Sequence, residues 1–147
     1  MTVGRAVRPG RPAGTMAGMD RAQVEHWVAG YETAWRSPGT GALGDLFAPE
    51  VSYLPSPWAR PVEGLPALAE WWEAGRDGPD EAFTMASEVV AVEGDTAVVR
   101  VAVDYGDPDG QRWRDLWVMR FDGEGRCLAF EEWPFSPDQP DGQDHGD

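Results

Sequence analysis

The second half of the chain alternates apolar and polar side chains with a period of two, which restricts it to an antiparallel sheet. Four such segments lie at residues 83–92, 96–105, 111–121 and 126–135, separated by short turns rich in glycine and acidic residues. This period is typical of strands with one buried face, and short turns of this kind join neighbouring strands as hairpins. We therefore expect a four-stranded antiparallel meander.

The first half of the chain has helical spacing instead. Asp20 is followed three residues later by Gln23, a capping-box pattern that starts a helix. A short second helix is expected over "GALGDLF", a short strand at "VSYL", and a third helix from Pro66 to Gly75. Helices followed by strands predict an α+β fold in which the helices close one face of the sheet. The apolar stripe of the first helix consists of Val24, Trp27, Val28, Tyr31 and Trp35.

Both ends of the chain differ from this middle part. Residues 1–19 are rich in glycine, proline and arginine, and residues 137–147 are acidic with several prolines and glycines. Because neither end has apolar periodicity, both are predicted to be disordered tails around one domain at residues 20–136, with His145 in solvent. Met1, Met16 and Met19 are alternative start sites.

The composition excludes several classes of function. The formal charge of −14 argues against a nucleic-acid partner, and no apolar run approaches the roughly 18 residues of a membrane span. The single cysteine, Cys127, excludes an internal disulfide and a cysteine-rich zinc site, and favours a reduced, cytoplasmic compartment. His26 lies off the apolar stripe without other metal-binding residues near it, so no metal and no cofactor are expected. The absence of lysine, asparagine and isoleucine, which share AT-rich codons, indicates a GC-rich bacterial gene.

The strand at 111–121 carries an unexpected aspartate on its apolar face. Arg112, Arg114, Leu116, Val118 and Arg120 form its other face, while the apolar set is Trp113, Asp115, Trp117, Met119 and Phe121. A two-residue hairpin at Gly123–Glu124 would place Trp117 opposite Phe130, Asp115 opposite Glu132, and Cys127 on the face away from Asp115.

Two carboxyls in an aromatic hollow disfavour double ionisation, so the pKa of at least one should rise, which suits a general acid or base. Two alternatives remain open. Asp115 would instead lie at a solvated rim beside the arginines, and a shift of one residue would turn Glu131 rather than Glu132 inward.

The order of these elements resembles the NTF2-like superfamily, and within it the SnoaL-like (ketosteroid-isomerase-like) group. The resemblance covers residues 20–136 and rests on "DLFAPEVSYL", "EGLPALAEWW" and "LWVMRFDGEGRCLAFEEW". It implies a cone in which a curved antiparallel or mixed sheet wraps around a long N-terminal helix, with two shorter helices and a deep pocket. It also implies a homodimer through the convex face of the sheet, where Leu116, Val118, Ala129 and Trp133 are expected.

Comparison with the enzymes of this superfamily narrows the chemistry. Against ketosteroid isomerase, Tyr31 matches the oxyanion-holding tyrosine, but Pro55 replaces the general base and Trp117 the protonated aspartate. Against limonene epoxide hydrolase, Asp115 and Glu132 are similar to its two acids, but Trp113 replaces its arginine and the chain has no asparagine. SnoaL-like polyketide cyclases imply little more than one inward carboxylate, for which Asp115 is the candidate.

Two functions therefore remain. The first is a cofactor-free acid/base enzyme of cyclase, dehydratase, isomerase or hydrolase type, acting on an apolar ring substrate through Asp115, Glu132 and Tyr31. The second is a non-catalytic ligand-binding or interaction module with the same fold. Trp58, in the proline-rich turn "PSPWARP", is a candidate lid over the pocket mouth. The residues expected to bind substrate are Trp27, Tyr53, Trp58, Trp113, Trp117, Met119 and Phe130.

Overall fold

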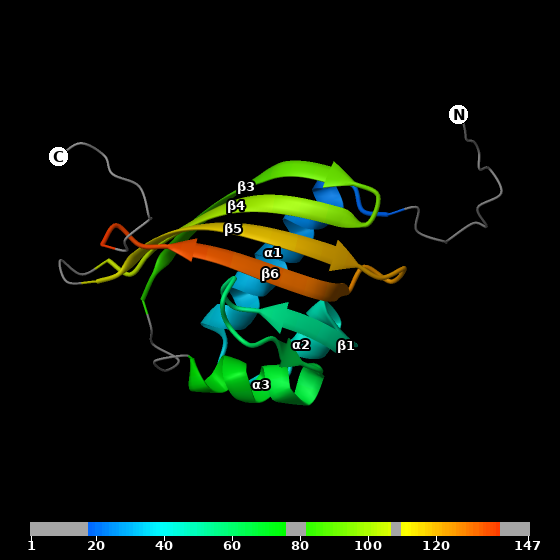
Figure 1. The fold of residues 1–147 in the computed structure, drawn as a ribbon, viewed down its shortest axis with the longest axis horizontal. Helices are drawn as coiled ribbons and strands as arrows, with labels where there is room; N and C mark the ends of the chain where they lie inside the picture. Colours follow the sequence, from blue (N-terminus) through cyan, green and yellow to red (C-terminus); the bar gives the residue numbers. More distant parts are fainter. Residues whose placement is uncertain (1–17, 76–81, 107–109, 139–147) are drawn as a thin grey trace.

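A computed structural model describes residues 18–75, 82–106 and 110–138, and its elements follow the predicted order (Figure 1). Most of the predicted tails at 1–19 and 137–147, including His145, and part of the turn at 106–110 lie outside the described residues. The elements are α1 (Arg21–Arg36), α2 (Leu43–Leu46), β1 (Phe47–Leu54), β2 (Val62–Glu63), α3 (Leu65–Ala74), β3 (Thr84–Glu93), β4 (Thr96–Asp104), β5 (Arg112–Phe121) and β6 (Cys127–Phe135).

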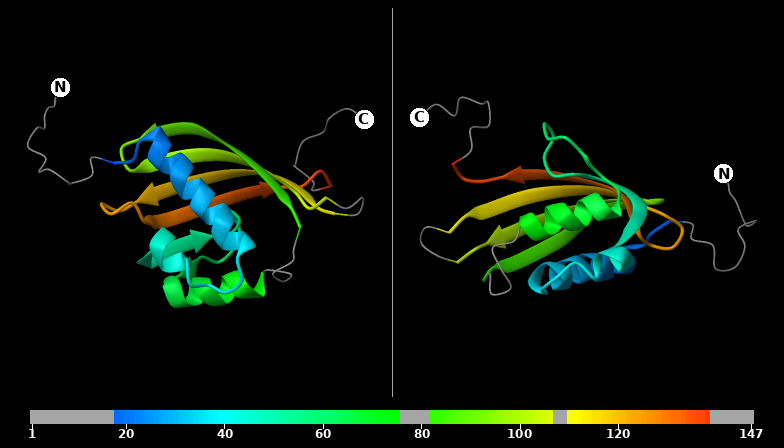
Figure 2. Two further views of the ribbon diagram at one scale, coloured as in Figure 1. Left: turned by 180° about the vertical axis from the view of Figure 1, so that it is seen from behind. Right: turned by 90° about the horizontal axis from the view of Figure 1, so that it is seen from below.

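One six-stranded sheet, in the order β2-β1-β6-β5-β4-β3, curves over α1 (Figures 1 and 2). The predicted meander is confirmed as β3 to β6, whose neighbouring strands are all antiparallel. β1 extends the sheet by pairing in parallel with β6, and the short β2 pairs with β1 at the edge. The predicted α+β fold with helices on one face of a curved sheet is therefore confirmed, while β2 and the early start of β1 are additions.

Helix α1 lies along the concave face of the sheet and supplies the centre of the core (Figure 2). The predicted capping box is present, because Asp20 and Gln23 exchange side-chain and backbone hydrogen bonds. The Trp27 indole N–H donates to the Leu46 carbonyl at 2.8 Å, which satisfies it inside the core. Met19 also joins the fold, since its backbone N–H donates to the Gly94 carbonyl at 2.8 Å.

The register between β5 and β6 differs from the predicted one by two residues. The hairpin loop has three residues rather than two: Asp122 pairs with Arg126, and Gly125 takes a positive φ of 81°. A β-bulge then shifts the pairing again between Arg120 and Phe121. Trp117 therefore lies opposite Glu132, not Phe130, and Asp115 lies opposite Pro134.

Together the loop and the bulge shift the pairing by two residues. Because side chains alternate between the two faces of a strand, most side chains of β6 keep the predicted face. Cys127 is the exception, because it lies between the loop and the bulge and experiences only the first shift. The prediction that it points away from the interior is wrong: Cys127 is fully buried in the core. Burial raises the pKa of its thiol, so it is held as the unreactive neutral form.

Candidate active site

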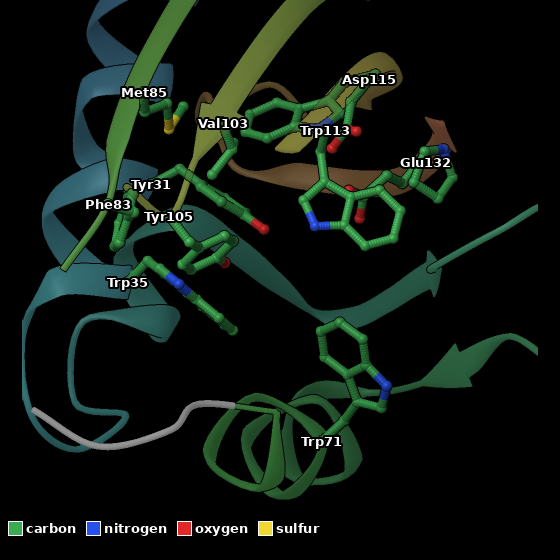
Figure 3. A pocket seen from close by; sticks show the side chains of 12 residues that line it. Tyr31, Trp35, Trp71, Phe83, Met85, Val103, Tyr105, Trp113, Asp115 and Glu132 are labelled. Carbon is green, nitrogen blue, oxygen red and sulfur yellow. The ribbon is translucent and has the colours of Figure 1, made fainter. Parts of the chain in front are cut away.

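A cavity of about 250 Å³ lies between one end of α1, helix α3 and the strands β3 to β6 (Figure 3). Aromatic rings from all these elements form most of its wall. Among the described residues, its only charged lining side chains are the two carboxyls Asp115 and Glu132. The lining residues are Tyr31, Trp35, Trp71, Phe83, Met85, Val103, Tyr105, Trp113, Asp115, Trp117, Glu132 and Pro134.

The sheet positions this wall through cross-strand neighbours. Met85 of β3, Val103 of β4 and Trp113 of β5 lie directly opposite one another and form a row across three strands. Asp115 follows two residues later on β5 and therefore faces the same side as Trp113. The alternation along β5 thus carries the wall from Trp113 through Asp115 to Trp117, as the sequence predicted.

Asp115 and Glu132 come from neighbouring strands and meet in this cavity. Asp115 is only 6% exposed and is the sole buried charged residue of the described chain, whereas Glu132 is half-buried. Because Glu132 lies opposite Trp117, it is a diagonal rather than a direct neighbour of Asp115. A diagonal pair remains within reach when one side chain is long, and the extra methylene of glutamate provides that reach.

The environment of the pair disfavours its ionisation. Burial raises the pKa of Glu132 well above its ordinary value, and the hydrogen bond and negative charge of Asp115 raise it further. Burial also raises the pKa of Asp115, while hydrogen bonding to Glu132 partly offsets that rise. Simultaneous ionisation of the two carboxyls is therefore disfavoured, and they titrate as an interacting pair.

Two buried polar atoms at the cavity wall lack a partner. Neither the Oδ1 atom of Asp115 nor the Nε1 atom of Trp117 forms a hydrogen bond of normal geometry, although the Trp117 indole favours the ionised form of Asp115. Leaving such a group unsatisfied costs about 1–3 kcal/mol, so folded chains seldom keep one without a reason. Both atoms belong to residues that line the cavity, and both atoms are themselves buried.

Two tyrosines extend the polar part of the site into the core. The hydroxyl of Tyr31, which lines the cavity, lies 3.0 Å from the hydroxyl of Tyr53 behind it. Burial raises the pKa of Tyr31, and the charges of Glu132 and Asp115 raise it further. Burial likewise raises the pKa of Tyr53. Both phenols are therefore neutral and can donate hydrogen bonds, Tyr31 toward the cavity.

The structure brings together only part of the predicted site. Tyr31, Asp115, Glu132, Trp113 and Trp117 all line the cavity, and Glu132, not Glu131, is the residue whose side chain faces it. The alternative that Asp115 lies at a solvated rim is wrong, because the residue is only 6% exposed.

Five residues predicted to bind substrate do not line this cavity. Four are packed in the core instead, where aromatic rings stack on one another, such as Tyr53 on Phe130 at 4.5 Å between centroids. Trp58 is 98% exposed in the loop between β1 and β2, so it is not a lid in this structure. The four core residues are Trp27, Tyr53, Met119 and Phe130.

Sequence reasoning missed much of the aromatic wall. Trp35 and Trp71 lie on recognised helical stripes, but their exposure at the cavity depends on how α1 and α3 meet the sheet. Phe83 and Tyr105 lie beside the ends of β3 and β4 with ring centroids 5.7 Å apart. The pairing of Met85 with Val103 could be counted residue by residue from the turn between Glu93 and Thr96. That count is wrong by one residue unless the bulge between Val89 and Ala91 is known.

Two other kinds of site are absent from the described residues. They contain no group of three or more histidine, cysteine, aspartate or glutamate side chains placed to hold a metal ion. None of the helices in the described ranges has the length and apolar character needed to cross a membrane.

Comparison with known proteins gives a family model and several structural relatives. The model described as the SnoaL-like domain matches residues 24–129. A search of curated proteins found no match. One similar structure is SalBIII, an epoxide hydrolase/cyclase-like enzyme in pyran ring formation in the polyether salinomycin. It has 16% identity and a TM-score of 0.64, and the match covers 79% of this chain and 93% of SalBIII.

Two further structures extend this comparison. A provisionally assigned SnoaL-like polyketide cyclase from Jannaschia sp. CCS1 has 19% identity and a TM-score of 0.62, with 80% of this chain and 91% of the cyclase covered. A protein of unknown function with a cystatin-like fold from Methylobium petroleophilum PM1 has 20% identity and a TM-score of 0.64, with 88% and 84% covered. At these identities the likeness describes the fold.

Proposed function

Because the chain belongs to the SnoaL-like domain family, we propose that its cavity binds a small ring compound and that Asp115 and Glu132 transfer a proton to and from it. The observation that carries this proposal is the pair itself: two interacting carboxyls, one of them buried, in a cavity otherwise walled by apolar and aromatic side chains. Carboxyls whose environments push their pKa values apart take opposite roles as acid and base. The chemistry needs no cofactor.

The roles of the two carboxyls follow from their environments. Asp115, with its Oδ1 atom unpartnered, is the base that removes a proton from a carbon or oxygen of the substrate. Glu132, whose pKa is raised further, carries the proton that is returned at a second atom of the same substrate. Removal at one atom and return at another moves a double bond or closes a ring, and leaves Asp115 protonated and Glu132 ionised. Transfer of that proton from Asp115 to Glu132 then restores the starting state of the pair.

Tyr31 supports this transfer as a hydrogen-bond donor. Negative charge develops on a substrate oxygen when a neighbouring proton is removed, and a neutral phenol stabilises that charge. The Tyr53 hydroxyl, 3.0 Å behind it, orients the Tyr31 hydroxyl. Ring closure, named for SalBIII, and cyclisation, named for the Jannaschia protein, are both reactions in which protons move in this way.

Solvent deuterium exchange on simple ketones tests the proposal whatever the natural substrate is. Small cyclic ketones such as 2-tetralone and 2-indanone are incubated with the protein in D₂O, and deuterium incorporation next to the carbonyl is followed by mass spectrometry. We expect accelerated incorporation by the wild type and a loss of about 10²–10⁴-fold in Asp115→Asn, the usual contribution of a positioned base.

Glu131→Gln is the matched control, because Glu131 neighbours Glu132 in sequence but accepts a hydrogen bond from Trp133 on the other face of the sheet. This variant should exchange at the wild-type rate. Binding of the ketones without faster exchange, or equal rates in Asp115→Asn and wild type, would favour the non-catalytic ligand-binding module instead.

The convex face of the sheet supports a second proposal, a homodimer. Leu116 and Trp133 lie opposite each other on β5 and β6 and are 38% and 39% exposed, with Val118 and Ala129 half-buried beside them. An exposed apolar patch of this kind is typical of an interface. Val118→Glu should halve the mass measured by light scattering, and an unchanged mass would show that this face is not the interface.

A further inference from the structure

The cavity combines aromatic walls with acidic groups and has no basic lining residue in the described part of the chain. From this combination we infer that the ligand carries a protonated amine, which lies among the aromatic rings and donates a hydrogen bond to Asp115. The inference rests on the proposed function in using the same cavity, and it adds the charge of the ligand.

The unpartnered acceptor is the first support. Asp115 is only 6% exposed, yet its Oδ1 atom has no hydrogen-bond partner. A buried carboxylate in a folded protein is ordinarily paired with a cation or with several donors. Here the charged neighbour of Asp115 in the cavity is another carboxyl, Glu132, so no positively charged lining residue balances the charge of Asp115.

The aromatic wall is the second support. Trp35, Trp71, Tyr105 and Trp113 reach the cavity from four different elements or their ends, so rings surround the space beside the carboxyls (Figure 3). Faces of tryptophan and tyrosine attract ammonium groups through their quadrupoles, most strongly where water is excluded. A ring-bearing ammonium would therefore find both a counter-charge and favourable aromatic contacts.

Arg36, which contacts the lining residue Phe83, does not supply that charge. Arg36 lies with its guanidinium carbon 3.9 Å from the ring centroid of Phe83, and its Nη2 atom is 2.8 Å from the Glu32 carboxylate. Arg36 is thus neutralised on its own helix and is not part of the lining. Arg112 and Arg114 belong to the exposed face of β5. An anionic ligand would meet only like charge in the cavity.

Three probes that share one phenyl ring and differ in charge test the inference: benzylammonium, benzyl alcohol and benzoate. Binding is measured at pH 7.5 by calorimetry and by tryptophan fluorescence. Because a hydrogen bond to a charged group is stronger than a neutral one by roughly 1.4 kcal/mol, benzylammonium should bind about tenfold more tightly than benzyl alcohol. Benzoate should bind most weakly.

Two variants separate the two supports. Asp115→Asn keeps the shape of the side chain but removes its charge, and should reduce the preference for benzylammonium over benzyl alcohol by at least about fivefold. Trp113→Leu keeps an apolar wall but removes an aromatic face, and should weaken benzylammonium more than benzyl alcohol. Glu131→Gln, which changes the same kind of charge on the other face, should leave all three affinities unchanged.

Equal or tighter binding of benzyl alcohol or benzoate, or no binding of any probe, would overturn the inference. The deuterium-exchange assay keeps this result distinct from failure of the proposed function. Exchange on neutral ketones without a preference for the amine would contradict only the ammonium ligand. A preference for the amine without exchange on any ketone would contradict only the proton transfer.

Discussion

The two ends of the inner face of β5 have the same alternation but different surroundings. At one end, Met119 and Phe121 are buried in a continuous core, where Phe121 lies edge-on to Trp27 at 5.6 Å. At the other end, Trp113 and Asp115 face a cavity, and one oxygen of Asp115 has no partner. Similar side-chain positions on one strand therefore serve packing at one end and a candidate site at the other.

The difference between the two ends is in packing rather than in the presence of unpaired polar atoms. In the core, the Trp27 indole N–H donates to the Leu46 carbonyl, but the Nε1 atom of the fully buried Trp72 has no partner. At the cavity end, Asp115 Oδ1 and Trp117 Nε1 are likewise without a partner. The cavity end is distinguished by a buried carboxyl in the wall of an open space, so substitutions there should affect function more than stability.

The largest effect on stability is expected from Phe130→Ala at the core end. Phe130 is 1% exposed and stacks on Tyr53, so its truncation should lower the free energy of unfolding by about 3–5 kcal/mol. Trp113→Ala should lower the free energy of unfolding by only about 1 kcal/mol, because part of the Trp113 side chain faces the cavity and packs against no other side chain. Urea denaturation measures both, and equal losses would contradict the division into core and cavity.

An intermediate effect, of opposite sign, is expected from Glu132→Gln. The raised pKa values of Glu132 and Asp115 mean that the folded chain holds protons which the unfolded chain releases above pH of about 4. The free energy of unfolding must then fall as the pH rises from that ordinary value through the raised native ones.

Glu132→Gln removes one of these carboxyls, so the variant should be more stable than the wild type at pH 8 by about 1–3 kcal/mol, the usual cost of an unsatisfied buried group. The gain should shrink toward pH 4, where the wild-type carboxyls are protonated. Urea denaturation at the two pH values gives the comparison, with Glu131→Gln as the control that should show no such trend. A variant that is less stable at pH 8 would show that the pair stabilises the fold.

The smallest effect is expected from Tyr53→Phe, which removes the hydroxyl that connects the core to the cavity. One buried hydrogen bond, at 3.0 Å to Tyr31, is lost, and the free energy of unfolding should fall by about 1 kcal/mol. Binding of cyclic ketones should persist, because Tyr53 itself does not line the cavity. Abolished binding would place Tyr53 in the site rather than behind it.

The architecture was predictable because it depends on local patterns. The capping box at Asp20, the helical stripe and the period of two from residue 84 onward each specify an element without long-range information. The quoted motifs were sufficient to identify the SnoaL-like family, which the family model confirms over residues 24–129. The placement of Asp115 on the inner face of β5 follows from the same alternation.

The register and the division between core and cavity were not predictable. The loop at Gly125 and the bulge near Cys127 each change the pairing by one residue, and neither has a unique signature in the sequence. Glu132 has its predicted face only because the two shifts together move the pairing by two residues, and a shift of two leaves a side chain on the same face of the sheet. Phe130 and Trp117 both belong to the core and lie 5.0 Å apart between ring centroids, yet only Trp117 also lines the cavity, and this difference depends on how the sheet curves around α1.

Carboxyl NMR shows directly whether Asp115 and Glu132 share a proton inside the cavity. Titration of the ¹³C-labelled carboxyls of both residues gives their pKa values in the folded protein. Glu132 should titrate well above ordinary glutamate, and Glu132→Gln should change the titration of Asp115. Two independent titrations near the ordinary carboxyl value would contradict a shared proton.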